Sequence, residues 1–220
     1  MKEYLPFRGI LGLGKESTMY YLNQIQEKFK ENNESYSTCP FLMYQIDFQE
    51  INPFLPDQFS ILIPKLKVYF EQISELGITK FLVPNITLHK TLDQIDFPFQ
   101  ICHPVDLTLK ELVKRNCSEI ILFGTVYTMN STYMSRKFSG QNIKVSIPST
   151  KDQNEIDDFR KVVFERKETS AEILHFQNLI RKYSEKNPVV IACTELSIYA
   201  PKNTFTCIDM ADLQIEEFLK

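Results

Sequence analysis

Short apolar runs alternate with longer amphipathic stretches along almost the whole chain of 220 residues, and this alternation strongly constrains the fold. Seven runs rich in β-branched and aromatic residues are predicted to be strands: RGILGL, FLMYQI, KFLVP, FQIC, EIILFG, IKVSI and VVIAC. Six stretches with apolar residues at three- and four-residue spacing are predicted to be helices: 17–30, 59–76, 107–115, 155–165, 170–184 and 211–219. Repeated alternation of strand and helix predicts an α/β fold with mostly parallel sheets flanked by helices.

The two halves of the chain resemble each other. ILGLGKEST in the first half corresponds to ILFGTVYTM in the second, and FLVPNITLH corresponds to VVIACTELS. Gly12 and Asn85 are separated by almost the same number of residues as Gly124 and Cys193. Unless the similarity between the halves is due to chance, the pattern predicts two pseudosymmetric lobes, 1–103 and 104–207, with 208–220 returning to the first lobe.

Composition narrows the classes of function. The formal net charge is −3 and the lysines are scattered among acids, so we expect no nucleic-acid partner. We also expect no membrane association and a cytoplasmic location, because the chain lacks an apolar run of about 18 residues and the N-terminal MKEYLPFRGI lacks the features of a signal peptide. Five cysteines, an odd number without CxxC spacing, argue against a disulfide framework and a cysteine-based zinc site.

Polar groups follow several of the predicted strands, at the sheet edge where ligands bind in such folds. Cys193 follows VVIA and precedes Thr194-Glu195, so it is either a thiolate stabilised at a helix start or a small buried hydrophobe. The segments 12–18 and 124–128 offer backbone N–H groups and hydroxyls to an anion. Neither segment completes a dinucleotide-binding or P-loop motif, so neither NAD nor ATP is expected.

These motifs, in this order, resemble the aspartate/glutamate racemase superfamily, whose members invert the α-carbon of an amino acid without pyridoxal phosphate. GILGLGKEST resembles the opening G-I-x-G-G-M-G-x-E-x-T, FGTVYTM resembles G-T-x-x-T-M, and IACTEL resembles G-C-T-E-[LI]. IDMADLQIEEFL resembles the closing strand and helix of the family, with Gln214 where relatives often have histidine or alanine nearby. The resemblance covers nearly the whole chain.

The resemblance implies two α/β lobes with a cleft between them that holds a small amino acid or dicarboxylate, no cofactor and no metal. It also implies a homodimer, as in many relatives, and a place in amino-acid metabolism. Family enzymes use two cysteines, one on each face of the α-carbon, and Cys193 matches the cysteine of the second lobe. The implied substrate-binding residues, several of which could instead be simple caps, are Gly14, Thr18, Gln45, Thr87, His89, Thr125, Thr128, Lys167, Thr194 and Glu195.

Two of these implied roles have alternatives. Lys167 matches a family lysine that neutralises a substrate carboxylate, but Arg166 is adjacent and could do the same, or Lys167 could belong to a solvated helix end. His89 or His103 could serve as an acid/base, although a lone histidine more often only hydrogen-bonds its neighbours.

The sequence departs from the family at the first-lobe motif C-N-T-x-H, which reads Asn85-Ile86-Thr87-Leu88-His89. An amide cannot relay a proton as a thiol does, so we expect Asn85 to orient substrate or water. The leading hypothesis is a cofactor-independent racemase or epimerase that transfers the α-proton through Cys193. The alternatives are a one-base enzyme on the same scaffold, such as a decarboxylase or isomerase of a small dicarboxylate, and a catalytically silent dicarboxylate-binding protein.

Overall fold

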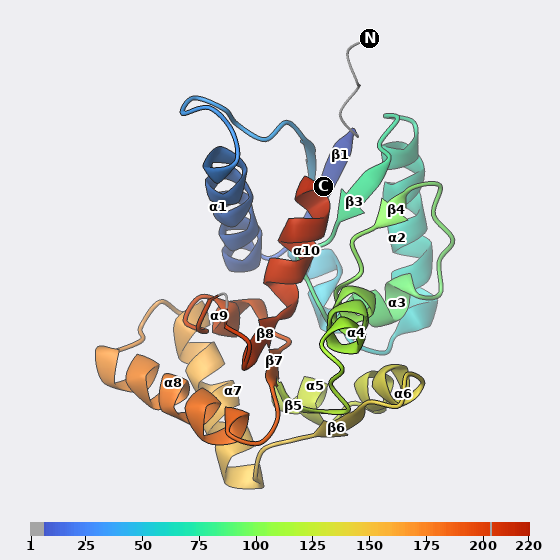
Figure 1. The fold of residues 1–220 in the computed structure, drawn as a ribbon. Coiled ribbons are helices and arrows are strands. Elements are labelled where there is room, and N and C mark those ends of the chain that lie inside the picture. Colours follow the sequence, from blue (N-terminus) through green and yellow to red (C-terminus); the bar gives the residue numbers. More distant parts are fainter. Residues whose placement is uncertain (1–6, 203) are drawn as a thin grey trace. The chain divides into compact units, whose positions relative to one another are not determined.

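The structure, a computed structural model, describes residues 7–202 and 204–220 and contains two four-stranded sheets whose strands are all parallel (Figure 1). The start of MKEYLPFRGI, used above for the signal-peptide prediction, lies outside the described residues. The first sheet has the order β2-β1-β3-β4 and the second the order β6-β5-β7-β8. The strands are β1 (Arg8–Gly12), β2 (Leu42–Gln45), β3 (Lys80–Leu82), β4 (Gln100–Ile101), β5 (Glu119–Phe123), β6 (Lys144–Ser146), β7 (Val189–Ile191) and β8 (Cys207–Asp209).

Helices connect successive strands, as parallel pairing requires. The longer helices are α1 (Lys15–Glu31), α2 (Phe59–Ser74), α4 (Pro104–Lys114), α7 (Thr150–Phe164), α8 (Ser170–Ser184) and α10 (Met210–Leu219). The shorter ones are α3 (His89–Leu92), α5 (Val126–Asn130), α6 (Thr132–Ser139) and α9 (Thr194–Ser197), with 3₁₀ turns η1 (Phe48–Glu50) and η2 (Asn52–Phe54). All seven predicted strands and all six predicted helices are present. In the described part of the chain, no helix is long and apolar enough to span a bilayer.

The chain divides into two compact units. The first extends to His103 and also includes Gln214–Lys220, and the second is Pro104–Leu213. Residues 208–213, which we expected to return to the first lobe, lie in the second unit because β8 pairs with β7 from Val189↔Cys207 to Ile191↔Asp209. Only the last turns of α10 belong to the first unit.

In the first unit, alternate residues of each strand face opposite sides of the sheet. Leu11 of β1 and Phe81 of β3 belong to a buried cluster with the apolar positions of α2, including Leu66 and Phe70. Tyr21 of α1 is buried outside this cluster and hydrogen-bonds Gln214 of α10 at 2.6 Å. The sheet is therefore covered on both faces.

The second unit repeats this arrangement. Phe123 of β5 and Ile191 of β7 lie in a buried cluster with Phe159 of α7 and Phe176 of α8. Neighbouring strand positions such as Leu122 are fully buried but lie outside that cluster, as expected for the opposite face of a covered sheet.

The register of the strands matches the proposed internal repeat. Phe81, four residues before Asn85, pairs with Gly9, three residues before Gly12. In the same way Val189, four residues before Cys193, pairs with Ile121, three residues before Gly124. Asn85 and Cys193 therefore hold corresponding positions beyond corresponding strands.

Candidate functional site

The thiol of Cys193 lies directly beyond the carboxyl end of β7, where the backbone passes from strand to helix. The N–H of Ala192 still donates to the carbonyl of Phe123 at 2.8 Å, and Cys193 then takes the N-cap position of α9 with extended backbone angles. The Cys193 carbonyl accepts the N–H of Ser197 at 3.1 Å. Its Sγ donates to Oε2 of Glu195 at 3.0 Å. One helical turn thus places a thiol and a carboxylate in contact.

Burial determines the protonation state of this thiol. Cys193 is only 7% exposed, and burial, reinforced by the neighbouring Glu195 carboxylate, raises the pKa of the thiol well above its usual range. The positive charge of Arg160 acts in the opposite direction but does not reverse the shift. The expectation of a thiolate favoured by the helix start is therefore wrong for this resting arrangement, in which α9 is a single turn and the thiol is the proton donor.

Arg160 is a cation near Cys193 that sequence reasoning missed. It lies in α7, its Nε donates to Oδ1 of Asp157 at 3.0 Å, and its side chain is 23% exposed. The sequence feature that could have indicated Arg160 is its three-residue spacing from Asp157 within the predicted helix. Lys167, the predicted carboxylate ligand, lies beyond the end of α7, is 73% exposed and donates to Glu165 at 2.8 Å.

The threonines that follow β5 hold their own loop together. Thr125 caps α5, because its hydroxyl accepts the N–H of Thr128 at 3.0 Å, and the two hydroxyl oxygens are 2.9 Å apart. Thr128 is buried, and a Cβ on Gly124 would approach the Thr128 side chain at 3.1 Å. Thr194, also buried, opens α9. The capping alternative describes Thr125, and the Thr128 side chain packs closely against Gly124.

Asn85, at the position that corresponds to Cys193, closes the turn that precedes α3. Its Oδ1 accepts the N–H of Leu88 at 2.9 Å, and its carbonyl accepts a hydrogen bond from Nδ1 of His89 at 2.9 Å. Thr87 is half-buried within the same turn, which leads into α3. The amide oxygen of Asn85 is thus committed to the backbone of its own loop.

Two histidines meet near the ends of β3 and β4. His89 is fully buried, and because its Nδ1 faces a carbonyl acceptor, Nδ1 carries the proton and Nε2 the lone pair. Burial, with a further contribution from His103, lowers the pKa of His89 well below its usual range. The His103 ring stands edge-on to it with centroids 4.8 Å apart, and His103 Nε2 lies 3.3 Å from Oδ1 of Asp93.

The loop after β1 is closed by its own threonine. Gly14 takes the N-cap position of α1, and its carbonyl accepts the N–H of Thr18 at 2.9 Å. The buried hydroxyl of Thr18 accepts the N–H of Leu13 at 3.0 Å. Thr18 therefore shapes this loop from within.

Gln45, the last residue of β2, lies across the end of β1. Its Nε2 donates to the carbonyls of Leu13 and Ile46, each at 2.9 Å. A Cβ on Gly12 would lie 2.1 Å from Gln45 Oε1, so the Gln45 side chain would have to shift to make room for it. Gly14, Thr18, Gln45, Asn85 and His89 all lie at the carboxyl edge of the first sheet, where its strands end.

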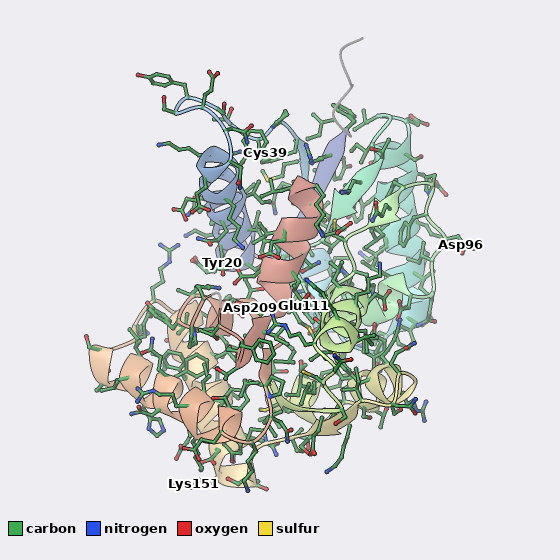
Figure 2. The ribbon with its side chains drawn as sticks, in the orientation of Figure 1. Tyr20, Cys39, Asp96, Glu111, Lys151 and Asp209 are labelled. Carbon is green, nitrogen blue, oxygen red and sulfur yellow. The ribbon has the colours of Figure 1, made fainter. Side chains whose placement is uncertain are left out.

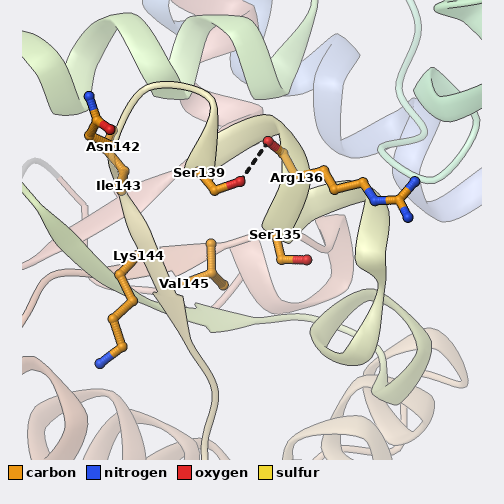
Figure 3. Close-up of a pocket in the computed structure, with 7 residues that line it drawn as sticks. All are labelled: Ser135, Arg136, Ser139, Asn142, Ile143, Lys144 and Val145. Atoms are coloured by element: carbon orange, nitrogen blue, oxygen red, sulfur yellow. Dashed lines mark hydrogen bonds between the residues drawn. The ribbon is translucent and has the colours of Figure 1, made fainter.

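A separate hollow of about 480 Å³ lies in the second unit between α6 and the start of β6 (Figure 3). Lys144 in its wall pairs in register with Glu119, the first residue of β5, so the hollow adjoins the amino ends of the strands and not the edge that carries Cys193. The charged ends of Arg136 and Lys144 point away from each other in Figure 3.

Cysteines other than Cys193 lie away from the strand ends or deep in the core. Figure 2 labels Cys39, in the segment that leads into β2. Cys102 is fully buried, and burial raises its pKa to about 12. Among the residues that the structure describes, no group of three or more His, Cys, Asp or Glu side chains could hold a metal ion.

The described fold is similar to several solved structures over nearly the whole chain. No protein-family model matches the sequence. A candidate Asp/Glu racemase from Yersinia pestis is 18% identical, with a TM-score of 0.84 and 98% of each chain covered. An aspartate racemase homologue from Pyrococcus horikoshii OT3 is 20% identical, with a TM-score of 0.79 and the same coverage.

The aspartate racemase of Picrophilus torridus is 17% identical, with a TM-score of 0.76 over 97% of this chain and 92% of that one. The chain has the Asp/Glu racemase fold. The predicted fold class is confirmed, with two four-stranded parallel sheets flanked by helices.

Proposed function

We propose that this chain is a cofactor-independent racemase or epimerase of the aspartate/glutamate type that exchanges the α-proton of a small acidic amino acid through Cys193. The observation that carries the proposal is the hydrogen bond from Cys193 Sγ to Glu195 at the end of β7. A carboxylate in contact with a thiol can accept its proton, which gives the thiolate that abstracts the α-proton. The Asp/Glu racemase fold supports the same reaction class.

The cation beside the thiol supports an acidic substrate. Arg160 is fixed by Asp157 and keeps a partly exposed guanidinium near Cys193, where it can bind a carboxylate through two parallel hydrogen bonds. We assign it the carboxylate-binding role that the resemblance gives to Lys167.

A one-base reaction on the same scaffold is the second candidate. The observation that favours it is the turn closed by Asn85, whose amide oxygen accepts the N–H of Leu88 where family members have a thiol. An enzyme with Cys193 alone would exchange the α-proton on one face and return it to the same face.

Proton NMR in deuterated water, with L- and D-aspartate and L- and D-glutamate as substrates and a chiral assay of the products, tests these candidates. We expect the α-proton signal to disappear with inversion. Cys193→Ala should slow exchange at least about 100-fold, because it removes the acid/base group. Cys117→Ala, which changes a partly exposed cysteine outside this site, should not. Exchange with retention would support the one-base enzyme, and no exchange with any of the four would reject the proposal.

A further inference from the structure

The turn that brings the Cys193 thiol and the Glu195 carboxylate together depends on contacts outside itself. α9 has only 4 residues, and isolated helices of fewer than about 12 residues are marginal in water. Leu196 is fully buried in the core cluster of the second unit. Ser197, the last residue of α9, is fully buried as well. The contacts of these two side chains therefore set the position of α9.

Ser197 bonds Asp209, the last residue of β8, which is labelled in Figure 2. β8 pairs with β7, and Asp209 lies opposite Ile191, so it lies at the carboxyl end of the strand next to the one that leads to Cys193. The Ser197 hydroxyl donates to Asp209 Oδ1 at 2.8 Å and also lies 3.2 Å from the Cys193 carbonyl oxygen. One buried hydroxyl thus links the end of β8 to the backbone of the candidate site.

Asp209 is itself held by the groups around it. The residue is only 5% exposed, and its Oδ1 also accepts the N–H of Ala211 at the start of α10 at 2.9 Å. Lys202 donates to Asp209 Oδ2 at 2.8 Å and to Asp212 at 3.1 Å. A buried carboxyl group with partners on both oxygens is costly to move, because movement would leave buried polar groups unpaired. Asp209 is therefore a fixed point to which Ser197 is bonded.

We propose that Asp209 is a positioning residue of the candidate site, which holds α9 through Ser197 and so keeps the Glu195 carboxylate in contact with the Cys193 thiol. All of these groups belong to the second unit. The consequence for catalysis rests on the proposed function, in which Glu195 accepts the proton of the thiol. Loss of the bond to Ser197 would loosen α9, separate the carboxylate from the thiol and admit water to the sulfur.

Ser197→Ala tests the proposal, because it removes the bond to Asp209 and leaves the other partners of Asp209 in place. We expect iodoacetamide to label Cys193 at least about fivefold faster near neutral pH, because burial and the Glu195 carboxylate no longer hold the pKa of the thiol up. Exchange of the α-proton should fall about tenfold or more. Peptide mass spectrometry follows the labelling, with Cys117 as the internal reference.

Thr108→Val is the matched control. The Thr108 hydroxyl is fully buried in α4 of the same unit and donates to the carbonyl of Pro104, four residues earlier, at 2.8 Å. Ser197 likewise lies 3.2 Å from the carbonyl four residues before it, but it alone of the two bonds Asp209. Thr108→Val should therefore change neither the labelling of Cys193 nor the exchange of the α-proton.

Two changes at Asp209 separate its bond to Ser197 from its other contacts. Asp209→Asn keeps an oxygen that can accept from both Ser197 and Ala211. Asp209→Ser keeps an acceptor for the N–H of Ala211, but its shorter side chain does not reach Ser197. Both changes remove the charge that pairs with Lys202. We expect Asp209→Ser to label as Ser197→Ala does, and Asp209→Asn to label within about twofold of the unchanged protein.

These outcomes are independent of the proposed function, because labelling of Cys193 requires no turnover. Unchanged or slower labelling in either Ser197→Ala or Asp209→Ser would overturn the positioning role. Equal acceleration in Asp209→Asn and Asp209→Ser would overturn it too, because the charge of Asp209 would then be responsible. Faster labelling in Ser197→Ala, in a protein that exchanges no α-proton, would support the positioning role and reject the proposed function. If Ser197→Ala does not fold, as judged by urea unfolding, the comparison of the two Asp209 variants decides.

Discussion

At the scale of single residues, Cys193 donates a hydrogen bond to Glu195, and the Glu195 carboxylate helps to raise the pKa of the thiol. In the resting arrangement the proton is on sulfur, because burial and the carboxylate both disfavour the thiolate. The charge of the carboxylate opposes formation of the thiolate. In the proposed mechanism the same carboxylate accepts the proton of the thiol. These two effects can be measured separately.

Glu195→Gln should make Cys193 react faster with iodoacetamide near neutral pH, because removal of the negative charge lowers the pKa of the thiol. The same change should slow α-proton exchange about tenfold or more, because an amide cannot accept the proton. Peptide mass spectrometry can follow the labelling of Cys193, with Cys117 as the internal reference. Glu165→Gln, at an exposed glutamate paired with Lys167, should change neither rate. Slower labelling in Glu195→Gln would contradict this account.

Arg160 and Lys167 give opposite expectations for substrate binding. Arg160→Gln should raise KM for a dicarboxylic amino acid about tenfold or more, because a charge-assisted pair with the substrate is lost. Lys167→Gln should have little effect, since this lysine is exposed and bonded to Glu165. Steady-state kinetics on both variants would decide which cation binds the substrate carboxylate. A larger rise of KM in Lys167→Gln would restore the role that the family resemblance implies for Lys167.

His89 makes stability depend on pH. The folded chain keeps His89 neutral because burial lowers its pKa, whereas in the unfolded chain it titrates near 6.5. Below that pH the unfolded state binds a proton that the folded state does not, so the free energy of unfolding falls as pH falls, by up to about 1.4 kcal/mol per pH unit. Urea unfolding between about pH 7 and about pH 5 should show a smaller loss in His89→Gln than in the unchanged protein, and His175→Gln should keep the full loss. An equal dependence of the free energy of unfolding on pH in all three proteins would refute the assignment of this loss to His89.

At the scale of elements, the contact between β1 and β2 depends on a missing side chain. Gly12→Ala would place a Cβ 2.1 Å from Gln45 Oε1, so the glutamine must move and lose its bonds to two carbonyls. We expect a cost of about 1–3 kcal/mol in the free energy of unfolding. The cost of Gly12→Ala should be smaller in a Gln45→Ala background. Gly14→Ala, whose Cβ would meet only ordinary contacts, is the control. Additive costs in the double variant would show that Gln45 is not the obstacle.

The helices and strands that the sequence predicted are those long enough to show a periodic pattern of apolar residues. α8 begins and ends where the pattern predicted, since Thr169 and Glu172 form a capping box at its start. α7 begins earlier than predicted because its first turns are polar, and only the cap from Ser149 marks the true start. α9 is a single turn and α6 shows only two buried residues, so neither contains a full apolar stripe.

Within the site, the sequence indicated which polar groups follow strands. These groups lie at one edge of the sheet, because parallel strands end at a common edge. It did not reveal pairings between elements, such as the edge-on contact of His89 with His103, which come from different segments. It also did not reveal the resting proton of Cys193, because burial is a property of the packed core and not of the local motif.

At the scale of the whole chain, a buried network ties the last helix to the first sheet. Gln214 accepts a hydrogen bond from the Tyr21 hydroxyl at 2.6 Å and donates to the carbonyl of Cys102 at 2.7 Å. Arg8 is also buried, and its guanidinium donates to the carbonyls of Phe218 and Leu219 at the end of α10. Contacts between residues some two hundred positions apart therefore complete the first unit.

Tyr21→Phe should lower the free energy of unfolding by about 1–3 kcal/mol, because it leaves the buried oxygen of Gln214 without this donor. Denaturant unfolding measures the change, and the double variant with Gln214→Leu should cost less than the sum of the two single changes. Tyr36→Phe, at a tyrosine that is 98% exposed, should be neutral. An equally neutral Tyr21→Phe would mean that this network does not contribute to stability.

Because Gln214–Lys220 belong to the first unit, the second unit is the first to have all of its residues during synthesis. Residues 104–213 form one continuous segment, so the second unit has all of its residues as soon as Leu213 leaves the ribosome. Synthesis of the first unit begins earlier, but Arg8 and Tyr21 lack their partners Phe218 and Gln214 until residues 214–220 have been made. The unit whose synthesis begins first is therefore the unit that obtains its last residues last.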